Sequence, residues 1–215
     1  MTTSSFRRYT SLPILLDILK EKRLTLLDPR SWDDKNDSYY LELYKTKRDL
    51  KSVLALCFAE VPETYHIWRV FAGDSNGVCI EFDKDMLLGY FDIGGVRRGY
   101  VEYLTLGRLK KNESRDLNQL PFMKRHAFRD EKEFRFIYES KEEAISAKGV
   151  PIKLNCIQRI IFNPWIHQSI FNSVKSVIEG IDGCDKITID KTSLVDNEQW
   201  KALGREISNS ADATE

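Results

Sequence analysis

The stretch AFRDEKEFRFIYES, Ala127–Ser140, has the alternation of a β-strand in its second half. Successive side chains of an extended chain point to opposite faces, so Phe134 and Phe136 share one side. Glu133 and Arg135 share the other, with a carboxylate and a guanidinium roughly 7 Å apart along the strand. The aromatic side is typical of a core. The charged side is either a solvated sheet face or the acidic corner of a site.

Strand and helix patterns alternate outward from this stretch. The apolar run SVLALCFA predicts an interior strand, and alternation or β-branched content predicts strands elsewhere. Further strands are expected at 5–12, 77–82, 97–104, 148–154, 158–164 and 185–190. Helices are expected at 13–24, 62–73, 83–91, 121–130 and 167–180, and loops at 28–40 and 109–120. The last helix joins two strands as a crossover. We therefore predict an α+β fold, with a mixed, strongly bent β-sheet flanked by helices.

Length and charge favour an ordinary soluble protein. With 215 residues we expect a single α+β domain over 1–205, followed by a disordered tail over 206–215. Lys and Arg together number 33, as do Asp and Glu, so no overall field favours nucleic acid or an anionic membrane. No apolar run approaches the roughly 20 residues that cross a bilayer. The start of the chain has no secretory pattern, so we expect a cytoplasmic protein.

Cysteine and histidine spacing gives no metal motif. The four cysteines lie far apart and form no CxxC pair, which argues against both a metal site and a disulfide framework. The acids Asp28, Asp33, Asp34 and Asp37 would suit the metal of a nuclease, but acids this close in one loop are more often turn formers.

Four motifs together resemble a known family. RRYTSL, DDKNDSYY, HIWRVFAGDSNGVCIEF and FRDEKEFRFIY occur in the order found in the bacterial and phage domain-of-unknown-function family number 2971. The resemblance covers about residues 6–164, and its last two motifs are the most specific. Three positions depart from the family pattern: Ser38 replaces a proline, Phe71 a tyrosine and Ala59 a serine.

That family is similar, as a remote fold analogy, to ADP-ribosyltransferases. These enzymes cleave the nicotinamide–ribose bond of NAD and pass ADP-ribose to a protein or nucleic acid. The resemblance implies a residue on the first strand that holds NAD, a middle-strand hydroxyl and a later glutamate. Arg8 with Tyr9 matches the first, and Glu133 or Glu131 matches the third. Ala59 removes the hydroxyl expected at the second.

The side chains themselves suit this chemistry. Glu133 would stabilise the positive charge that builds on the ribose, and Glu131 would handle the proton of the acceptor. Arg8 would hold the pyrophosphate, because its planar fork matches phosphate oxygens. Further cofactor-binding candidates are Tyr9, Tyr39 and Trp68 as stacking rings, and Asn36, Asp37 and Arg135 as polar residues.

The leading interpretation is thus an NAD-dependent ADP-ribosyltransferase-like enzyme, of the bacterial toxin or phage-defence type, with an unknown macromolecular acceptor. NAD hydrolysis without transfer is a close variant. The alternative is a non-catalytic module on the same fold that binds a nucleotide, nucleic acid or protein. These residues also have purely structural interpretations: Glu133 and Arg135 as an ion pair, Trp68 as a core residue, and Asn36 and Asp37 as helix or turn caps.

Overall fold

Two long strands, β3 (Ser52–Ala59) and β8 (Glu133–Ser140), pair antiparallel over their whole lengths in the computed structural model. The structure describes residues 5–111 and 116–212. β5 (Val96–Tyr100) pairs with the other edge of β8. β1 (Ser5–Ser11) and β2 (Arg23–Leu27) share the remaining edge of β3. The second half of the stretch Ala127–Ser140 therefore forms an interior strand, between β3 and β5.

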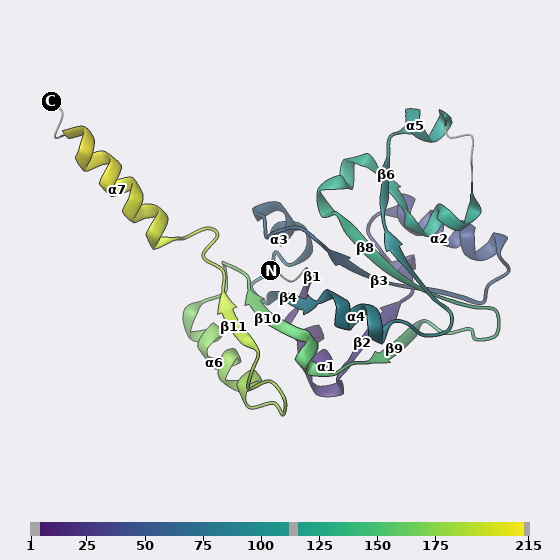
Figure 1. Ribbon diagram of the computed structural model, residues 1–215, viewed down its shortest axis with the longest axis horizontal. Coiled ribbons are helices and arrows are strands. Elements are labelled where there is room, and N and C mark those ends of the chain that lie inside the picture. The colour runs from purple at the N-terminus through teal and green to yellow at the C-terminus, as the bar shows by residue number, and fades with distance from the viewer. Residues whose placement is uncertain (1–4, 112–115, 213–215) are drawn as a thin grey trace.

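The sheet continues beyond β1 on one side and beyond β2 on the other. Beyond β1 lie β4 (Gly77–Asp83), β10 (Ile157–Phe162) and β11 (Thr188–Lys191), and beyond β2 lies β9 (Ala147–Pro151). β10 and β11 are parallel and are joined by α6 (Gln168–Glu179), which confirms the predicted crossover. The other pairs of this sheet are antiparallel. The sheet is mixed and has helices around it, so the α+β class is confirmed (Figure 1).

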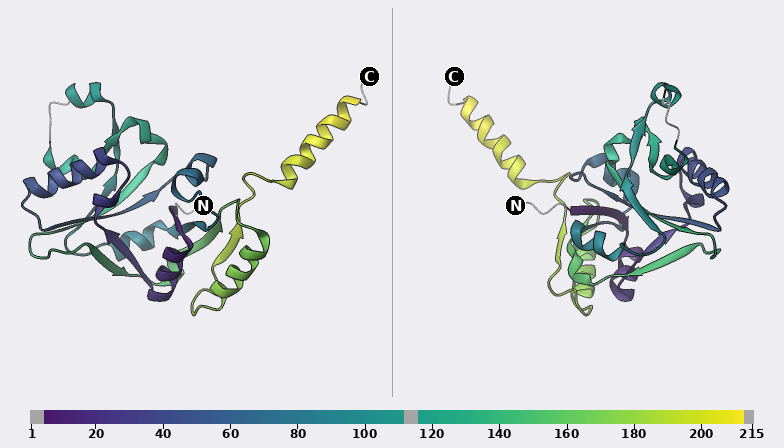
Figure 2. Two further views of the ribbon diagram at one scale, coloured as in Figure 1. Left: turned by 180° about the vertical axis from the view of Figure 1, so that it is seen from behind. Right: turned by 45° about the vertical axis from the view of Figure 1, so that its right-hand side comes forward.

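Helices pack against several strands of the sheet. α1 (Leu12–Glu21) follows β1, α4 (Lys84–Tyr90) follows β4, and α2 (Lys35–Lys47) packs beside β3. α3 (Tyr65–Phe71) contacts β1. α7 (Glu198–Asp212) projects away from the rest of the chain (Figures 1 and 2). Among the residues described, no helix is long and apolar enough to cross a membrane.

Both faces of β8 are buried. One face contributes Phe134 and Phe136 to the main core, with Phe6 and Phe58 from neighbouring strands. The other face contributes Ile137 to a second cluster under α2. Glu133 is 6% exposed and Arg135 is 0% exposed, which excludes the alternative of a solvated charged face. Because α2 covers that face, its charges must be satisfied inside the protein.

Two predictions of local structure are wrong. The expected loop 28–40 contains a 3-10 turn, η1 (Pro29–Ser31), and the start of α2 at Lys35. The acids of this segment were interpreted as turn formers. Asp34 is instead the N-cap of α2, and its side chain accepts from the backbone N–H groups of Asn36 and Asp37. The expected helix 121–130 is instead the end of η2 (Leu117–Phe122), then β7 (Met123–Arg125) and η3 (His126–Glu131). β7 pairs with β6 (Glu102–Leu104), and this pairing overrides local propensity.

Four smaller differences separate the structure from the predictions. The run 97–104 is split into β5 and β6. The predicted loop 109–120 begins in α5 (Leu106–Lys111) and ends in η2, while residues 112–115 lie outside the described part. A further short turn, η4 (Leu154–Cys156), precedes β10. α7 includes residues 206–212 of the expected tail, and 213–215 lie outside the described residues.

Candidate active site

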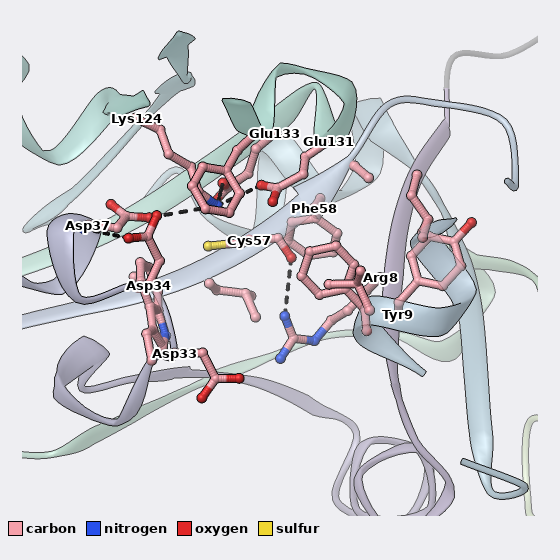
Figure 3. A pocket seen from close by; sticks show the side chains of 18 of the residues that line it. Arg8, Tyr9, Asp33, Asp34, Asp37, Cys57, Phe58, Lys124, Glu131 and Glu133 are labelled. Carbon is pink, nitrogen blue, oxygen red and sulfur yellow. Dashed lines mark hydrogen bonds and ion pairs between the residues drawn. The ribbon is translucent and has the colours of Figure 1, made fainter. Parts of the chain in front are cut away.

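A pocket of about 450 Å³ lies where the sheet opens along one edge of β3. Among the described residues, β1 joins β3 only at the pair Arg7 and Ala59, and β2 joins it only at Leu27 and Ala55. Between these two pairs the edge of β3 has no neighbouring strand. Residues 56–58 therefore line the pocket (Figure 3).

A buried guanidinium organises the acidic wall of the pocket. Arg135 donates from Nε to Glu133 Oε1 at 2.6 Å and from NH2 to Glu133 Oε2 at 3.0 Å. Its NH1 group donates to Asp37 Oδ1 at 2.8 Å and to the carbonyl of Pro121 at 3.0 Å. Glu133 and Asp37 line the pocket, whereas Arg135 lies behind them. Arg135 thus fixes the direction of both carboxylates from the protein side.

Lys124 joins a third carboxylate to this wall. Its Nζ atom lies 2.6 Å from Glu131 Oε2, 3.3 Å from Glu133 Oε2 and 3.8 Å from Asp37 Oδ2. Figure 3 shows Lys124, Glu131 and Glu133 together on one side of Cys57. When every group is ionised, three carboxylates face two cations, so the wall has one negative charge in excess. We call Asp37, Lys124, Glu131, Glu133 and Arg135 the acidic cluster.

The two glutamates of the cluster have widely different pKa values. Burial raises the pKa of Glu131 to about 7, against the pull of Lys124, and the charge of Glu133 adds to the rise. Burial also opposes ionisation of Glu133, but Arg135 and then Lys124 lower its pKa to about 2. For Lys124, burial alone would lower the pKa, yet Glu133 and Glu131 raise it above its usual value. Near neutral pH, Glu133 is ionised and Glu131 is at its midpoint.

Arg8 supplies a positive charge at the opposite edge of β3. It comes from β1, while Glu133 comes from β8, so the width of β3 separates their backbones by about 10 Å. Its NH1 group donates to the carbonyl of Cys57 at 3.1 Å, and burial lowers the pKa of its guanidinium. Among the described residues, no carboxylate pairs with Arg8, although a guanidinium carries five N–H donors.

Apolar and aromatic side chains form the rest of the lining. Val70 and Phe71, at the end of α3, are exposed and line one wall. Trp32 lies beside the acidic cluster, with its ring centre 5.2 Å from the Arg135 guanidinium carbon. The Phe128 ring centre is 4.8 Å from Lys124 Nζ. A ring of a ligand would therefore meet apolar walls next to a charged one.

The structure brings together some of the predicted site residues. Arg8, Tyr9, Asp37, Glu131 and Glu133 all line the pocket, and Arg135 stands directly behind. The other candidates, Asn36, Tyr39 and Trp68, lie outside the pocket lining. Convergence from β1, α2, η3 and β8 onto one opening is the feature that a linear sequence does not display.

Trp68, Tyr39 and Asn36 do not line the pocket. Trp68 is 0% exposed and donates from Nε1 to Glu63 Oε2 at 2.9 Å. It packs edge-on against Tyr9, with ring centres 5.1 Å apart. Tyr39 is 63% exposed on α2, and the side chain of Asn36 donates to Asp34. Trp68 therefore supports the pocket residue Tyr9 from behind.

Ala59 lies at the position that the family analogy gives to a hydroxyl. It pairs directly with Glu133 across β3 and β8 and lines the pocket. The nearest side-chain donor of β3 is instead Cys57, two residues earlier, whose thiol is hydrogen-bonded to Glu133. Burial raises the pKa of that thiol well above its usual value, so it stays protonated and donates to the Glu133 carboxylate.

Several pocket residues were missed by sequence reasoning. Lys124, Trp32 and Cys57 line the pocket but were not predicted, and Asp34 was weighed only as a metal ligand or turn former. Lys124 was hidden by the wrong prediction of a helix at 121–130, in which it resembles a solvated cation. The only signal in the sequence was its position seven residues before Glu131, which indicates nothing until β7 and η3 are known to fold back.

The clustered acids of the 28–37 segment have separate local roles. Asp28 caps η1 by accepting from the N–H of Arg30, Asp34 caps α2, and Asp37 pairs with Arg135. Asp33 is exposed at the pocket. Within residues 5–111 and 116–212, no group of three or more His, Cys, Asp or Glu side chains is arranged to hold a metal ion.

Residues 67–136 match the family described as "Protein of unknown function (DUF2971)". The DUF2971 match contains nearly all of the two motifs that carry the resemblance most specifically, from Ile67 to Phe136, and so confirms it there. It includes Lys124, Glu131 and Glu133 and excludes Arg8 and Asp37. A comparison with curated proteins gives no match.

Among solved structures, this chain is similar to DarT of Thermus sp. 2.9. The complex of DarT with NAD+ has 10% sequence identity and a TM-score of 0.44, and covers 89% of this chain and 96% of DarT. The complex with ADP-ribosylated single-stranded DNA has 11% identity and a TM-score of 0.46, and covers 89% and 95%.

Proposed function

We propose that this protein binds NAD in the pocket, cleaves the nicotinamide–ribose bond and transfers ADP-ribose to a macromolecular acceptor, a protein or a nucleic acid. The observation that carries the proposal is the charge arrangement across β3. Arg8, a guanidinium with no carboxylate partner among the described residues, stands at one edge. The acidic cluster, which carries one excess negative charge when every group is ionised, stands at the other. Oxidised NAD has the matching arrangement, with an anionic pyrophosphate and a cationic nicotinamide ring.

Arg8 is the residue that would hold the pyrophosphate. Its guanidinium is anchored by one hydrogen bond to Cys57 and keeps donors free for phosphate oxygens. No acidic neighbour among the described residues competes for its charge. A ligand anion would remove the cost of leaving a half-buried cation without a counter-charge.

Glu133 is the residue that would stabilise the transition state. Loss of nicotinamide builds positive charge on the ribose, and a fixed carboxylate nearby lowers the free energy of that state. Arg135 and Lys124 keep the Glu133 carboxylate ionised and fixed in direction. A carboxylate that is already oriented needs no reorganisation when the charge develops.

Glu131 is the residue that would accept the proton of the acceptor. Its pKa of about 7 lets it exchange a proton near neutral pH, whereas Glu133 cannot do so. Both carboxylates contact Lys124, so protonation of one changes the pKa of the other. Water in place of the macromolecular acceptor gives the variant reaction, NAD hydrolysis.

A non-catalytic binding module is the second candidate, and Ala59 is the observation that favours it. No hydroxyl stands opposite Glu133 on β3, so the middle position of the family analogy is changed. Such a module would use Arg8 and the same pocket to bind a nucleotide without turnover. For the enzyme, we infer the biological setting of a bacterial cytoplasmic effector, of the toxin or phage-defence type, from the family resemblance.

Nicotinamide release separates the two candidates. Purified protein is incubated with NAD+, and released nicotinamide is quantified by chromatography for the wild type and for Glu133→Gln. The enzyme releases nicotinamide and the variant does not. Saturable NAD+ binding without release in either protein would assign the pocket to a binding module instead.

A further inference from the structure

A second hollow, of about 720 Å³, lies at the opposite end of α2 from the acidic cluster. Asp37 in the first turn of α2 lines the pocket, and Tyr44 and Lys47 in its last turns line the hollow. The helix rise places Lys47 about 15 Å from Asp37 along the axis. No residue lines both cavities. The hollow is therefore separate from the site proposed above.

Cations dominate this hollow. Its lining includes Lys47, Arg48, Arg97 and Lys141 against one carboxylate, Glu139. They come from α2, β5, β8 and the chain directly after these elements. We call this set the basic hollow. In a chain of zero formal net charge, this local excess of three positive charges is a strong asymmetry.

Two guanidinium groups of the hollow converge on one neutral residue. Arg48 donates through NH2 to the side-chain oxygen of Asn118, and Arg97 donates through NH2 to the backbone oxygen of Asn118 at 2.7 Å. Arg97 is held further by the hydroxyl of Tyr44 at 2.8 Å and by Glu139 at 2.9 Å. Two like charges are thus fixed close together, and Glu139 offsets only one of them.

Most of this positive charge has no internal partner. Among the described residues, only Arg97 of the four cations forms an ion pair, with Glu139. Lys47, Arg48 and Lys141 are exposed and in none. The negative end of the α2 macrodipole accounts for a preference for Lys47 and Arg48 at that helix end. It does not account for Arg97 or Lys141, which belong to other parts of the chain.

We propose that the basic hollow binds clustered phosphate groups. The planar forks of Arg48 and Arg97 suit phosphate oxygens, and Lys47 and Lys141 add point charges around them. A single carboxylate would neutralise only one of the three excess charges, whereas a chain of phosphates neutralises all of them. The phosphates belong either to a free polyphosphate or to the backbone of a nucleic acid. This inference does not depend on NAD turnover in the pocket.

The test is calorimetric titration of the full chain with sodium tripolyphosphate at low salt. Arg48→Gln, whose side chain is exposed, should bind about tenfold more weakly, the effect of one lost charge-assisted hydrogen bond. Lys20→Gln, an exposed cation on α1, removes the same charge and should bind as the wild type. Arg8→Gln separates the two cavities, because it weakens binding only if the anion sits in the pocket. Thermal melting of each variant checks that it is folded.

A second arm replaces tripolyphosphate with a fluorescein-labelled thymidine oligonucleotide. Weaker binding by Arg48→Gln in either arm supports the basic hollow, and the arm that responds identifies free or backbone phosphates as the source. Absence of saturable binding in both arms, equal affinity of Arg48→Gln and the wild type, or loss of binding in Arg8→Gln alone would overturn the proposal.

Discussion

Glu133 and Arg135 point to the same side of β8 and are joined by two hydrogen bonds of 2.6 and 3.0 Å. Their relationship is asymmetric, because Glu133 lines the pocket while Arg135 is wholly buried behind it. Arg135 also holds Asp37, so one guanidinium links β8 to α2. The pair is therefore structural and also positions a pocket carboxylate, two roles that the sequence presented as alternatives.

Glu133→Gln should abolish nicotinamide release and also cost stability. The amide keeps one acceptor for Arg135 but loses its charge, so we expect the free energy of unfolding to fall by about 1–3 kcal/mol. Urea denaturation and nicotinamide release measure the two effects. Glu139→Gln is the matched control. Glu139 also lies on β8, and its carboxylate pairs with Arg97 of β5, outside the pocket lining. Equal loss of activity in both variants would show that activity follows stability rather than the Glu133 charge.

Stability should fall in acid partly through Glu133. Its pKa of about 2 in the folded protein lies below the usual value of 4.5, so its ionised form stabilises the fold above pH 4.5. That contribution is lost as the pH falls from 4.5 towards 2. Urea denaturation between pH 5 and 3 should show a steeper loss in the wild type than in Glu133→Gln. If the free energy of unfolding fell equally steeply with pH in both proteins, the acid sensitivity would come from groups other than Glu133.

The rate of ADP-ribose transfer should rise with pH through the titration of Glu131. With a pKa of about 7, its basic form increases between pH 6 and 8. Glu131→Gln has no such group, so its rate should be low and flat over this range. The measurement is kcat against pH at saturating NAD+ and acceptor. A pH profile that keeps its shape in Glu131→Gln would remove this residue from the mechanism.

Oxidised NAD should bind more tightly than reduced NAD. Both carry the pyrophosphate that Arg8 would hold, but only the oxidised ring is cationic and matches the acidic cluster. We expect about a tenfold difference in Kd at pH 8, narrowing at pH 6 as Glu131 takes up a proton. Calorimetry uses the wild type with a non-hydrolysable analogue of oxidised NAD, because Glu133→Gln would remove the excess negative charge of the cluster. Equal affinities at both pH values would contradict the placement of nicotinamide beside the cluster.

Arg8→Gln should weaken NAD+ binding with little change in kcat. Loss of a charge-assisted contact to phosphate costs about tenfold to a hundredfold in affinity. Arg159→Gln serves as control, because Arg159 pairs with Asp190 on β10 and β11, away from the pocket lining. An unchanged KM in Arg8→Gln would exclude it as the pyrophosphate ligand.

Trp68→Phe should destabilise the protein but leave the KM for NAD+ unchanged. Trp68 lies outside the pocket lining, and its indole N–H satisfies Glu63 in the interior. Loss of that hydrogen bond and of packing against Tyr9 should cost about 1–3 kcal/mol. Thermal denaturation and steady-state kinetics check the two expectations. A raised KM at unchanged stability would return Trp68 to the list of direct ligands.

The fold was largely predictable because its strands carry local signals. Alternation around Phe134 and Phe136 and the apolar run of β3 identified the central pair. Local signals failed where the partner was distant. The strand β7 exists because it pairs with β6. At α2 the local signal was instead misinterpreted, because the acid before Lys35 is a helix cap rather than a turn former.

The candidate site was predictable only in part for the same reason. Arg8 and Glu133 were found through residue chemistry and family resemblance, and the structure places both at one opening. Lys124 and Trp32 could not be found, because their role depends on segments that fold back over β3 and β8. The burial of Arg135 was also invisible, since the covering helix α2 starts in a segment that resembled a loop.

The most direct test of the proposed function follows both halves of NAD at once. Purified protein is incubated with NAD+ labelled in its adenylate half, with and without cell lysate, beside Glu133→Gln. We predict nicotinamide release and transfer of label to macromolecules by the wild type, and neither by the variant. Protease or nuclease treatment of the labelled product then identifies the acceptor class. Absence of nicotinamide release under every condition, from protein that binds NAD+, would contradict catalysis and leave a binding module.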